Sequence, residues 1–198
     1  MCELFAMSSR IPADVTFSLH EFARHGGATG PHEDGWGIAF YEDGDAQLFR
    51  EPAAAADSAL VRFIEKSPPG SDLVISHIRR AVRGSRVLKN TQPFARELGG
   101  RVHLFAHNGM LDAVEDSPDL TLGEFRPVGV TDSEYAFCTL LEMLRELWST
   151  GEPSLDERLA VVGDFAARIR PLGPANFIYC DGTAIFVHGH RRIQSDAE

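Results

Sequence analysis

A chain of 198 residues, of which 43% are hydrophobic and 24% charged, has the length and composition of one globular domain with a large core. Its formal net charge of −10 argues against a general nucleic-acid binder, because neutralising phosphates requires clustered lysine and arginine. No segment approaches the ~20 apolar residues of a membrane helix and no secretory leader opens the chain, so we expect a cytoplasmic protein that contacts no membrane.

The chain opens on Cys2, a residue small enough for the initiator methionine in front of it to be removed. Removal would leave a thiol and a free α-amine on one residue. Because an α-amine titrates near pH ~7.7 to 8 and a thiol near ~8.5, the amine can act as the base that activates the thiol. The alternative is a buried apolar cysteine in a strand. The other cysteines, Cys138 and Cys180, show no paired spacing, which indicates a reducing compartment.

Hydrophobic periodicity predicts a mixture of strands and helices in one domain spanning residues 1–198. The expected strands are 3–7, 38–41, 46–50, 73–76, 102–106, 176–180 and 183–188. The expected helices are 14–24, 57–66 with Asp57 as its cap, 131–148 with a capping-box pattern from Thr131 to Glu134, and 154–170. Residues 8–12 read as a break, 83–93 as a polar bend and 111–130 as irregular.

The glycine-rich stretch 26–37 predicts a mobile or tightly folded loop. It is neither a P-loop nor a dinucleotide fingerprint, because no lysine follows its glycines and a strand comes next. Three histidines, His77, His103 and His107, form no tight ligand pattern with carboxylates. We therefore expect neither a cofactor nor a metal.

Two buried strands end in polar residues, and one helix begins with an acid. Arg79 offers a guanidinium that can grip a carboxylate. Asn108 and Gly109 offer an amide and an unhindered N–H, the ingredients of an oxyanion hole. Asp132 offers an anion for an ammonium group, so with Cys2 these groups describe a pocket for an amino acid with a reactive carbonyl.

Each of these residues also has a structural interpretation. Arg79 could pair with a surface carboxylate, Asn108 and Gly109 could form a turn, and Asp132 could belong to the helix cap. These interpretations do not explain why the groups occur together.

Six short motifs make the sequence resemble the class-II glutamine amidotransferases, in particular the small stand-alone bacterial members. The motifs are Met1-Cys2-Glu3-Leu4, His32-Glu33-Asp34-Gly35-Trp36-Gly37, Ser76-His77-Ile78-Arg79, Asn90-Thr91-Gln92-Pro93-Phe94, Ala106-His107-Asn108-Gly109 and Thr131-Asp132-Ser133-Glu134. These proteins are N-terminal-nucleophile (Ntn) hydrolases, and the resemblance covers nearly the whole chain.

The resemblance implies an α+β fold, a four-layer α-β-β-α sandwich of two antiparallel sheets. It implies Cys2 as the nucleophile with its own amine as base, and Asn108 and Gly109 as the oxyanion hole. Arg79 would bind the α-carboxylate of glutamine and Asp132 its α-ammonium group. The loop 26–37 would be the flap that closes over the substrate.

The chain departs from the family pattern at three places. Gln92 stands where the family usually has histidine. The arginine that often precedes the loop aspartate is missing, and Arg24 is the nearest one upstream. The family's domain usually continues with further strands after the hairpin at 176–188, so we expect a sandwich that is incomplete at its C-terminal end or completed by another chain.

The sequence predicts an enzyme that hydrolyses the side-chain amide of glutamine and releases ammonia to water or to an acceptor subunit. A first alternative is a γ-glutamyl peptide or amide hydrolase that uses the same site. A second is a non-catalytic binding or regulatory module on the same fold, which Gln92 and the acidic composition motivate.

Overall fold

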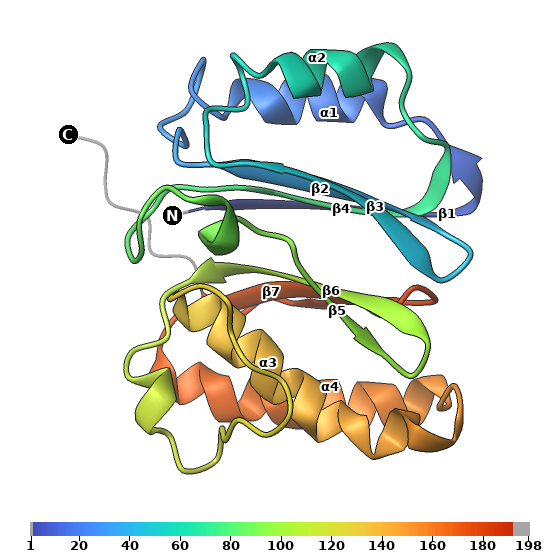
Figure 1. Cartoon of the computed structure of the whole chain (residues 1–198), viewed down its shortest axis with the longest axis vertical. Helices are drawn as coiled ribbons and strands as arrows, with labels where there is room; N and C mark the ends of the chain where they lie inside the picture. Colours follow the sequence, from blue (N-terminus) through green and yellow to red (C-terminus); the bar gives the residue numbers. More distant parts are fainter. Residues whose placement is uncertain (1, 192–198) are drawn as a thin grey trace.

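Two four-stranded antiparallel sheets face each other in the computed structural model, which describes residues 2–191, and helices cover the outer face of each (Figure 1). The first sheet has the order β1-β4-β2-β3 and the second the order β5-β6-β7-β8. The strands are β1 (Glu3–Ala13), β2 (Trp36–Glu42), β3 (Asp45–Glu51), β4 (Ser71–Ile78), β5 (Phe94–Leu98), β6 (Arg101–Gly109), β7 (Ala175–Cys180) and β8 (Ile185–His188). The helices are α1 (Thr16–Arg24), α2 (Ala59–Lys66), α3 (Asp132–Arg145) and α4 (Leu155–Ile169). The predicted four-layer α+β sandwich is confirmed for this part of the chain.

Alternation along the strands divides the core into three apolar layers. In β4, Val74 packs with α1 and α2, whereas Leu73 and Ile75 pack with residues of the second sheet. In β6, Leu104 faces the first sheet, whereas Phe105 packs with α3 and α4. Because the side-chain period of a strand is two, His77 and Asn108 continue the rows that face the space between the sheets.

Two strand predictions need correction, and both concern sheet edges. The predicted break at 8–12 is wrong, because β1 continues to Ala13 with an irregular register after Ser8. An edge strand tolerates Pro12, since one side of its backbone needs no ladder partner. The strand β5 was not predicted, because its interior residues Arg96 and Glu97 are polar and its pairing with β6 supplies the regularity.

Two helix starts differ from expectation, because α1 begins at Thr16 and not at residue 14, and α2 has a different cap. Ser58, not Asp57, is the N-cap of α2, since its hydroxyl accepts from the N–H groups of Leu60 and Val61. Thr131 caps α3 as predicted and accepts from the N–H of Glu134. The side chain of Glu134 does not complete the capping box. It accepts instead from the N–H of Gly129 at 2.6 Å and so anchors the loop in front of the helix.

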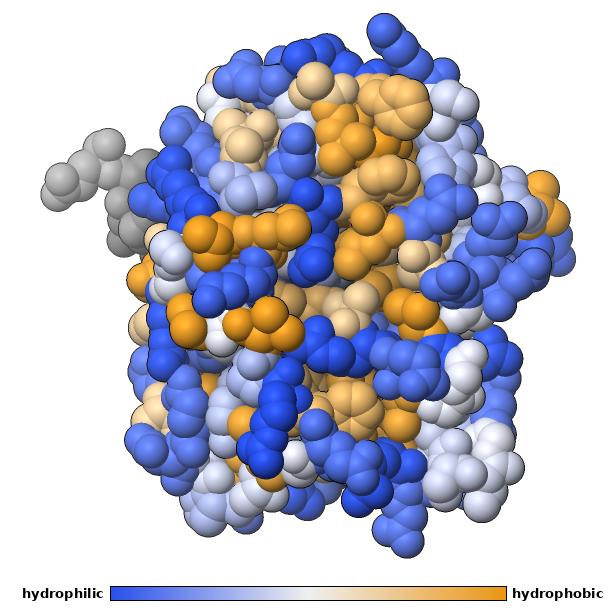
Figure 2. All heavy atoms as spheres, in the orientation of Figure 1, coloured by the Kyte–Doolittle hydropathy of each residue, from blue (hydrophilic) through white to orange (hydrophobic). Residues whose placement is uncertain are grey.

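Large hydrophobic side chains are exposed on the helices as well as elsewhere, among them Phe17 on α1, Phe63 on α2 and Leu159 on α4. On the face shown in Figure 2, hydrophobic atoms gather along the middle of the molecule. No helix within residues 2–191 is long and apolar enough to cross a bilayer.

Candidate active site

The predicted site residues converge at one end of the sandwich. There β1 begins, β4 and β6 end, and α3 begins, at the left edge of Figure 1. The two sheets therefore deliver Cys2 and Arg79 from one side and Asn108 and Gly109 from the other. Asp132 arrives as the first residue of α3.

Cys2 is partly buried against the backbone at the end of β4. Its Sγ accepts from the N–H of Arg80 at 3.4 Å and lies 3.5 Å from the carbonyl oxygen of the same residue. Burial raises the pKa of the thiol above its ordinary value, Asp132 adds to the rise, and the Arg80 backbone and the charge of Arg79 oppose it. Since these influences leave the thiol protonated at neutral pH, Cys2 requires a base before it can act as a nucleophile.

Arg79 lies beside this thiol and is itself buried, with 3% of its surface exposed. Its two terminal nitrogens donate to backbone carbonyls: Nη1 to Ser85 at 3.1 Å, and Nη2 to Arg83 at 2.8 Å and to Gly84 at 3.0 Å. The guanidinium therefore organises the turn at 83–85. Within residues 2–191 it pairs with no surface carboxylate, which was the structural alternative for this residue.

The end of the glycine-rich loop is tightly attached to the same strand. The N–H of Arg79 donates to the carbonyl of Gly35 at 2.7 Å, and the N–H of Asp34 donates back to the carbonyl of Arg79 at 3.1 Å. The carboxylate of Asp34 also pairs with Arg86 and accepts from the N–H of Ala81. These contacts hold the loop end and the arginine-rich turn together as one wall of the site.

Asn108 and Gly109 are the last two residues of β6. The carbonyl of Asn108 accepts from Nδ2 of Asn176 on β7 at 3.0 Å, whereas its side-chain Oδ1 is buried without a hydrogen bond from any described residue. A Cβ on Gly109 would overlap the carbonyl oxygen of Pro174 and lie 2.6 Å from Nε2 of His107. Glycine is thus required here by the close approach of the chain at 174, because any side chain would push the strand end away.

Asp132 is buried and follows the residue that caps the helix. Its Oδ2 accepts from the N–H of Leu111 at 2.8 Å, and its charge reaches both Cys2 and His107. The hydroxyl that caps the helix belongs to Thr131, and Asp132 beside it directs its carboxylate to Leu111. The carboxylate is placed near the thiol, as an ammonium-binding group requires.

Gln92, which stands where the family usually has histidine, makes a hydrogen bond within the site. Its Oε1 accepts from the N–H of His107 at 2.6 Å. At this position β6 extends beyond the end of its neighbour β5, so the backbone N–H has no partner in that strand. The His107 ring joins the same strand end to α3 and to residue 174, with Nδ1 2.9 Å from Oγ of Ser133 and Nε2 3.2 Å from the carbonyl oxygen of Pro174. Burial lowers the pKa of His107, although Asp132 and the Pro174 carbonyl oppose this.

Replacing Gln92 with alanine is expected to destabilise the fold by about 1–3 kcal/mol, because the buried N–H of His107 would lose its acceptor. Thermal or urea unfolding of the variant measures this cost. Gln92→His, which keeps an acceptor, is the matched control and should lose less. Equal stability of wild type and Gln92→Ala would show that the contact contributes nothing.

Three further residues of the site were given no role from the sequence, although His77 and Ser133 lie within two of the six motifs. Ser133 and Asn176 are recognisable only as partners of His107 and Asn108, and His77 is fully buried beside Arg79. Arg24, the nearest arginine upstream of the loop aspartate, lies on α1 and pairs with Glu21 at 3.2 Å. It takes no part in the contacts described above.

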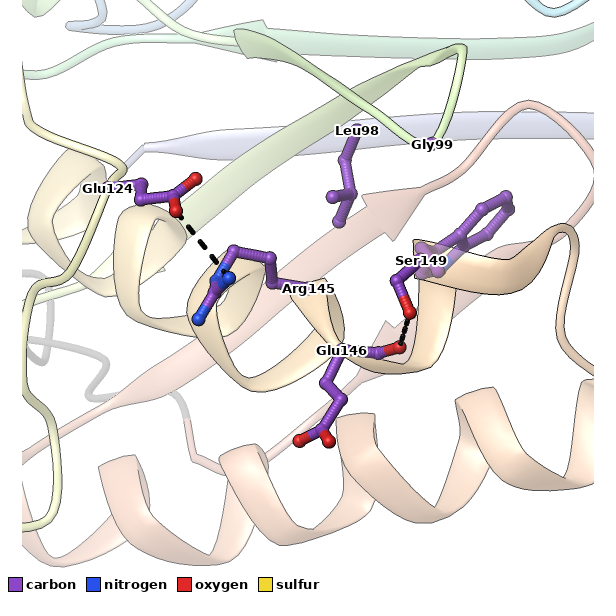
Figure 3. A pocket seen from close by; sticks show the side chains of 7 residues that line it. Leu98, Gly99, Glu124, Arg145, Glu146 and Ser149 are labelled. Atoms are coloured by element: carbon purple, nitrogen blue, oxygen red, sulfur yellow. Dashed lines mark hydrogen bonds and ion pairs between the residues drawn. The ribbon is translucent and has the colours of Figure 1, made fainter.

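Other features of the molecule lie away from these residues. No group of three or more potential metal ligands occurs within residues 2–191. A surface pocket of about 580 Å³ lies at the far end of α3, where Arg145 points toward Glu124 beside Leu98 and Ser149 (Figure 3). None of the predicted site residues lines that pocket.

Comparison with known proteins relates the whole chain to one family. Residues 1–195 match the family model of the class-II glutamine amidotransferases. The Escherichia coli (strain K12) protein named "Putative glutamine amidotransferase YafJ" is 39% identical over 188 residues, which cover 95% of this chain and 72% of that protein. A Haemophilus influenzae relative with the same family name is 37% identical, over 95% of this chain and 63% of its own length. A third relative, from Methanocaldococcus jannaschii, is covered over 50% of its length.

Solved structures agree with this relationship. The crystal structure of a predicted glutamine amidotransferase from Pseudomonas aeruginosa PA01 matches with a TM-score of 0.69 and 36% identity, over 95% of this chain and 72% of that one. The glutamine phosphoribosylpyrophosphate amidotransferase of B. subtilis, complexed with ADP and GMP, matches with a TM-score of 0.60 and 17% identity, over 94% of this chain and 36% of that one. The latter likeness concerns the fold alone.

Proposed function

Since the chain belongs to the class-II glutamine amidotransferases, we propose that it hydrolyses the side-chain amide of glutamine with Cys2 as the nucleophile. The α-amine left by removal of Met1 takes the thiol proton, and the thiolate attacks the amide carbon. The proton passes to the leaving nitrogen, ammonia departs, and a γ-glutamyl thioester remains on Sγ. Water then hydrolyses the thioester to glutamate and restores the thiol.

One observation carries this proposal: Arg79 and Asp132 both lie close enough to the Cys2 thiol for their charges to influence it. A cation and an anion near a nucleophile complement the α-carboxylate and the α-ammonium group of an amino acid. Asn108 and Gly109, at the end of the facing strand, would donate from the side-chain amide and the backbone N–H to the oxyanion of the tetrahedral intermediate.

Arg79 would have to exchange partners when the substrate binds. Its terminal nitrogens are occupied by the carbonyls of residues 83–85, which are neutral acceptors. A carboxylate is a stronger acceptor for a guanidinium than a neutral carbonyl, because the hydrogen bond is then assisted by charge on both sides. We therefore propose that the turn at 83–85 shifts as the α-carboxylate reaches Arg79.

Incubation of protein whose N-terminus has been confirmed as Cys2 with glutamine tests the proposal. Equal amounts of glutamate and ammonia are expected, and no release above a Cys2→Ala control would overturn it. Including γ-glutamyl amides and peptides in the same assay identifies the preferred leaving group. Ammonia that appears in another product when a partner is added would identify an acceptor subunit.

Asp132→Asn is expected to raise KM for glutamine roughly 10- to 100-fold, because the charge that holds the ammonium group is lost. Asparagine keeps an oxygen that can accept from the N–H of Leu111, so the start of α3 should stay in place. Steady-state kinetics separate KM from kcat, and kcat should change much less. A normal KM would remove Asp132 from substrate binding.

A further inference from the structure

His77 is a buried histidine for which the proposed chemistry has no use. It has no exposed surface and lies in the middle of the first sheet, paired in register with Leu4 on one side and Gly37 on the other. Its row on β4 also contains Leu73 and Ile75, which face the second sheet. The ring therefore points into the space between the sheets, at the end where the candidate site lies.

Neither ring nitrogen of His77 makes a hydrogen bond of normal geometry with a described residue, and the backbone carbonyl of His107 approaches the ring only as a weaker contact. The other buried histidines differ. His103 is bonded to the hydroxyl of Tyr179 at 2.7 Å and to the carbonyl of Leu98 at 3.0 Å, and both nitrogens of His107 are also bonded. A buried imidazole that leaves both nitrogens unpaired is costly, so such a residue demands a partner.

Asn108 has a buried hydrogen-bond acceptor that lacks a donor. This acceptor is Oδ1, and the side chain faces the same space from the second sheet. The two groups are neighbours, because the carbonyl of His107, which is bonded directly to the Asn108 nitrogen, is close enough to the His77 ring to affect its pKa. A donor and an acceptor that each lack a hydrogen bond of normal geometry thus face each other from β4 and β6, two strands that are in contact.

His77 can only act as a neutral ring. Burial lowers its pKa to about 3, with further contributions from Arg79, His107 and His32, and the His107 carbonyl opposes the shift. At physiological pH the imidazole therefore carries one N–H donor and one acceptor, and it cannot serve as a general acid.

We propose that His77 is a positioning residue that donates an N–H, directly or through one water molecule, to Oδ1 of Asn108. This inference rests on the proposed function for its kinetic consequence. The two ends of an asparagine amide are nearly the same in shape, so only hydrogen bonds determine which end faces the reaction. A donor on Oδ1 turns the NH₂ group toward the oxyanion, whereas a flipped amide would present an oxygen and repel it.

His77→Phe is expected to lower kcat for glutamine roughly 10- to 100-fold and to leave KM within about threefold, because an oxyanion donor is misdirected while glutamine binding is untouched. His77→Gln, which keeps an N–H donor, should recover a large part of the rate. His103→Phe is the matched control: it replaces another buried histidine on the second sheet and should cost stability without changing kcat. A normal kcat in folded His77→Phe would overturn the proposal.

A double-mutant cycle with Asn108→Ala separates positioning from a general structural effect. If His77 acts through Asn108, adding His77→Phe to Asn108→Ala should cause no further loss of kcat. Multiplicative losses in the double variant would show that His77 acts by another route.

Nuclear magnetic resonance gives a readout that does not depend on activity. The side-chain NH₂ signals of Asn108, assigned by their loss in Asn108→Asp, should shift or broaden in His77→Phe. In the wild type, the His77 ring should stay neutral between pH 5 and 9. Unchanged Asn108 signals, or a His77 titration near pH 6.5, would overturn the inference even if glutamine proved not to be the substrate. If the Asn108 and His77 signals behave as expected but no glutamate is released, the proposed function is refuted and the contact between His77 and Asn108 is not.

Discussion

Replacing Cys2 with alanine is expected to lower glutamate release from glutamine by about 10⁴-fold or more, the largest effect of any single substitution in this chain. The variant loses the atom that forms the thioester, and no other cysteine can replace it. Cys138 and Cys180 are both fully buried, and burial raises the pKa of the first to about 11 and of the second to about 12. Assays of ammonia and glutamate, with unfolding curves to confirm that the fold is intact, measure the effect.

Retention of Met1 should have nearly the same consequence while leaving the thiol in place. A lysine inserted between Met1 and Cys2 would prevent removal of the initiator methionine and so withhold the adjacent amine. Iodoacetamide should still alkylate this thiol. The rate of alkylation should rise with pH as the reactive thiolate forms, and the rise should lie at alkaline pH because burial raises the pKa of the thiol. Hydrolysis at the wild-type rate by such a variant would show that a different group activates Cys2.

Gly109→Ala is expected to give the second-largest effect, a loss of at least about 3 kcal/mol in the free energy of unfolding together with most of the activity. The added methyl would overlap the carbonyl oxygen of Pro174 and crowd Nε2 of His107. Because both are held in place by their mutual hydrogen bond, the end of β6 must move, and the backbone N–H proposed for the oxyanion hole moves with it.

Gly163→Ala is the matched control for that substitution. Gly163 lies on the exposed side of α4, and a Cβ there would meet no atom within 4 Å. Alanine in an exposed helix position should stabilise the protein by about 0.5–1 kcal/mol and leave hydrolysis unchanged. If Gly109→Ala behaved like Gly163→Ala, the chain at 174 would not restrict the strand end as described.

The residues of the candidate site are carried by different rigid elements of the fold. Strand ends bring together Cys2, the proposed nucleophile, and Asn108 and Gly109, the proposed oxyanion donors. The first turn of α3 adds the carboxylate of Asp132, which does not cap the helix. The binding groups are held by backbone contacts, as with Arg79 and the turn at 83–85. These contacts hold Arg79 in place before substrate binds, and the proposed exchange of the 83–85 carbonyls for the α-carboxylate would replace them.

The sequence by itself determined the centre of the candidate site and most of the fold. Cys2 is identified by its position next to Met1, and the strands that carry Arg79 and Asn108 are identified by their apolar runs. These features are local, because periodicity and chain position depend only on neighbouring residues. The layered architecture followed from a resemblance that spans many such local motifs.

Only the tertiary structure decided which groups pair with one another. Residues 94–98 form the strand β5 because they pair with β6. Gln92 accepts from the N–H of His107, and Arg79 donates to the carbonyls of residues 83–85, only because the fold brings these segments together. It also brought the unpaired ring of His77 up to the strand end that carries Asn108. Partners of this kind come from different strands and loops, so their distance is set by how the two sheets pack and not by any pattern within one segment.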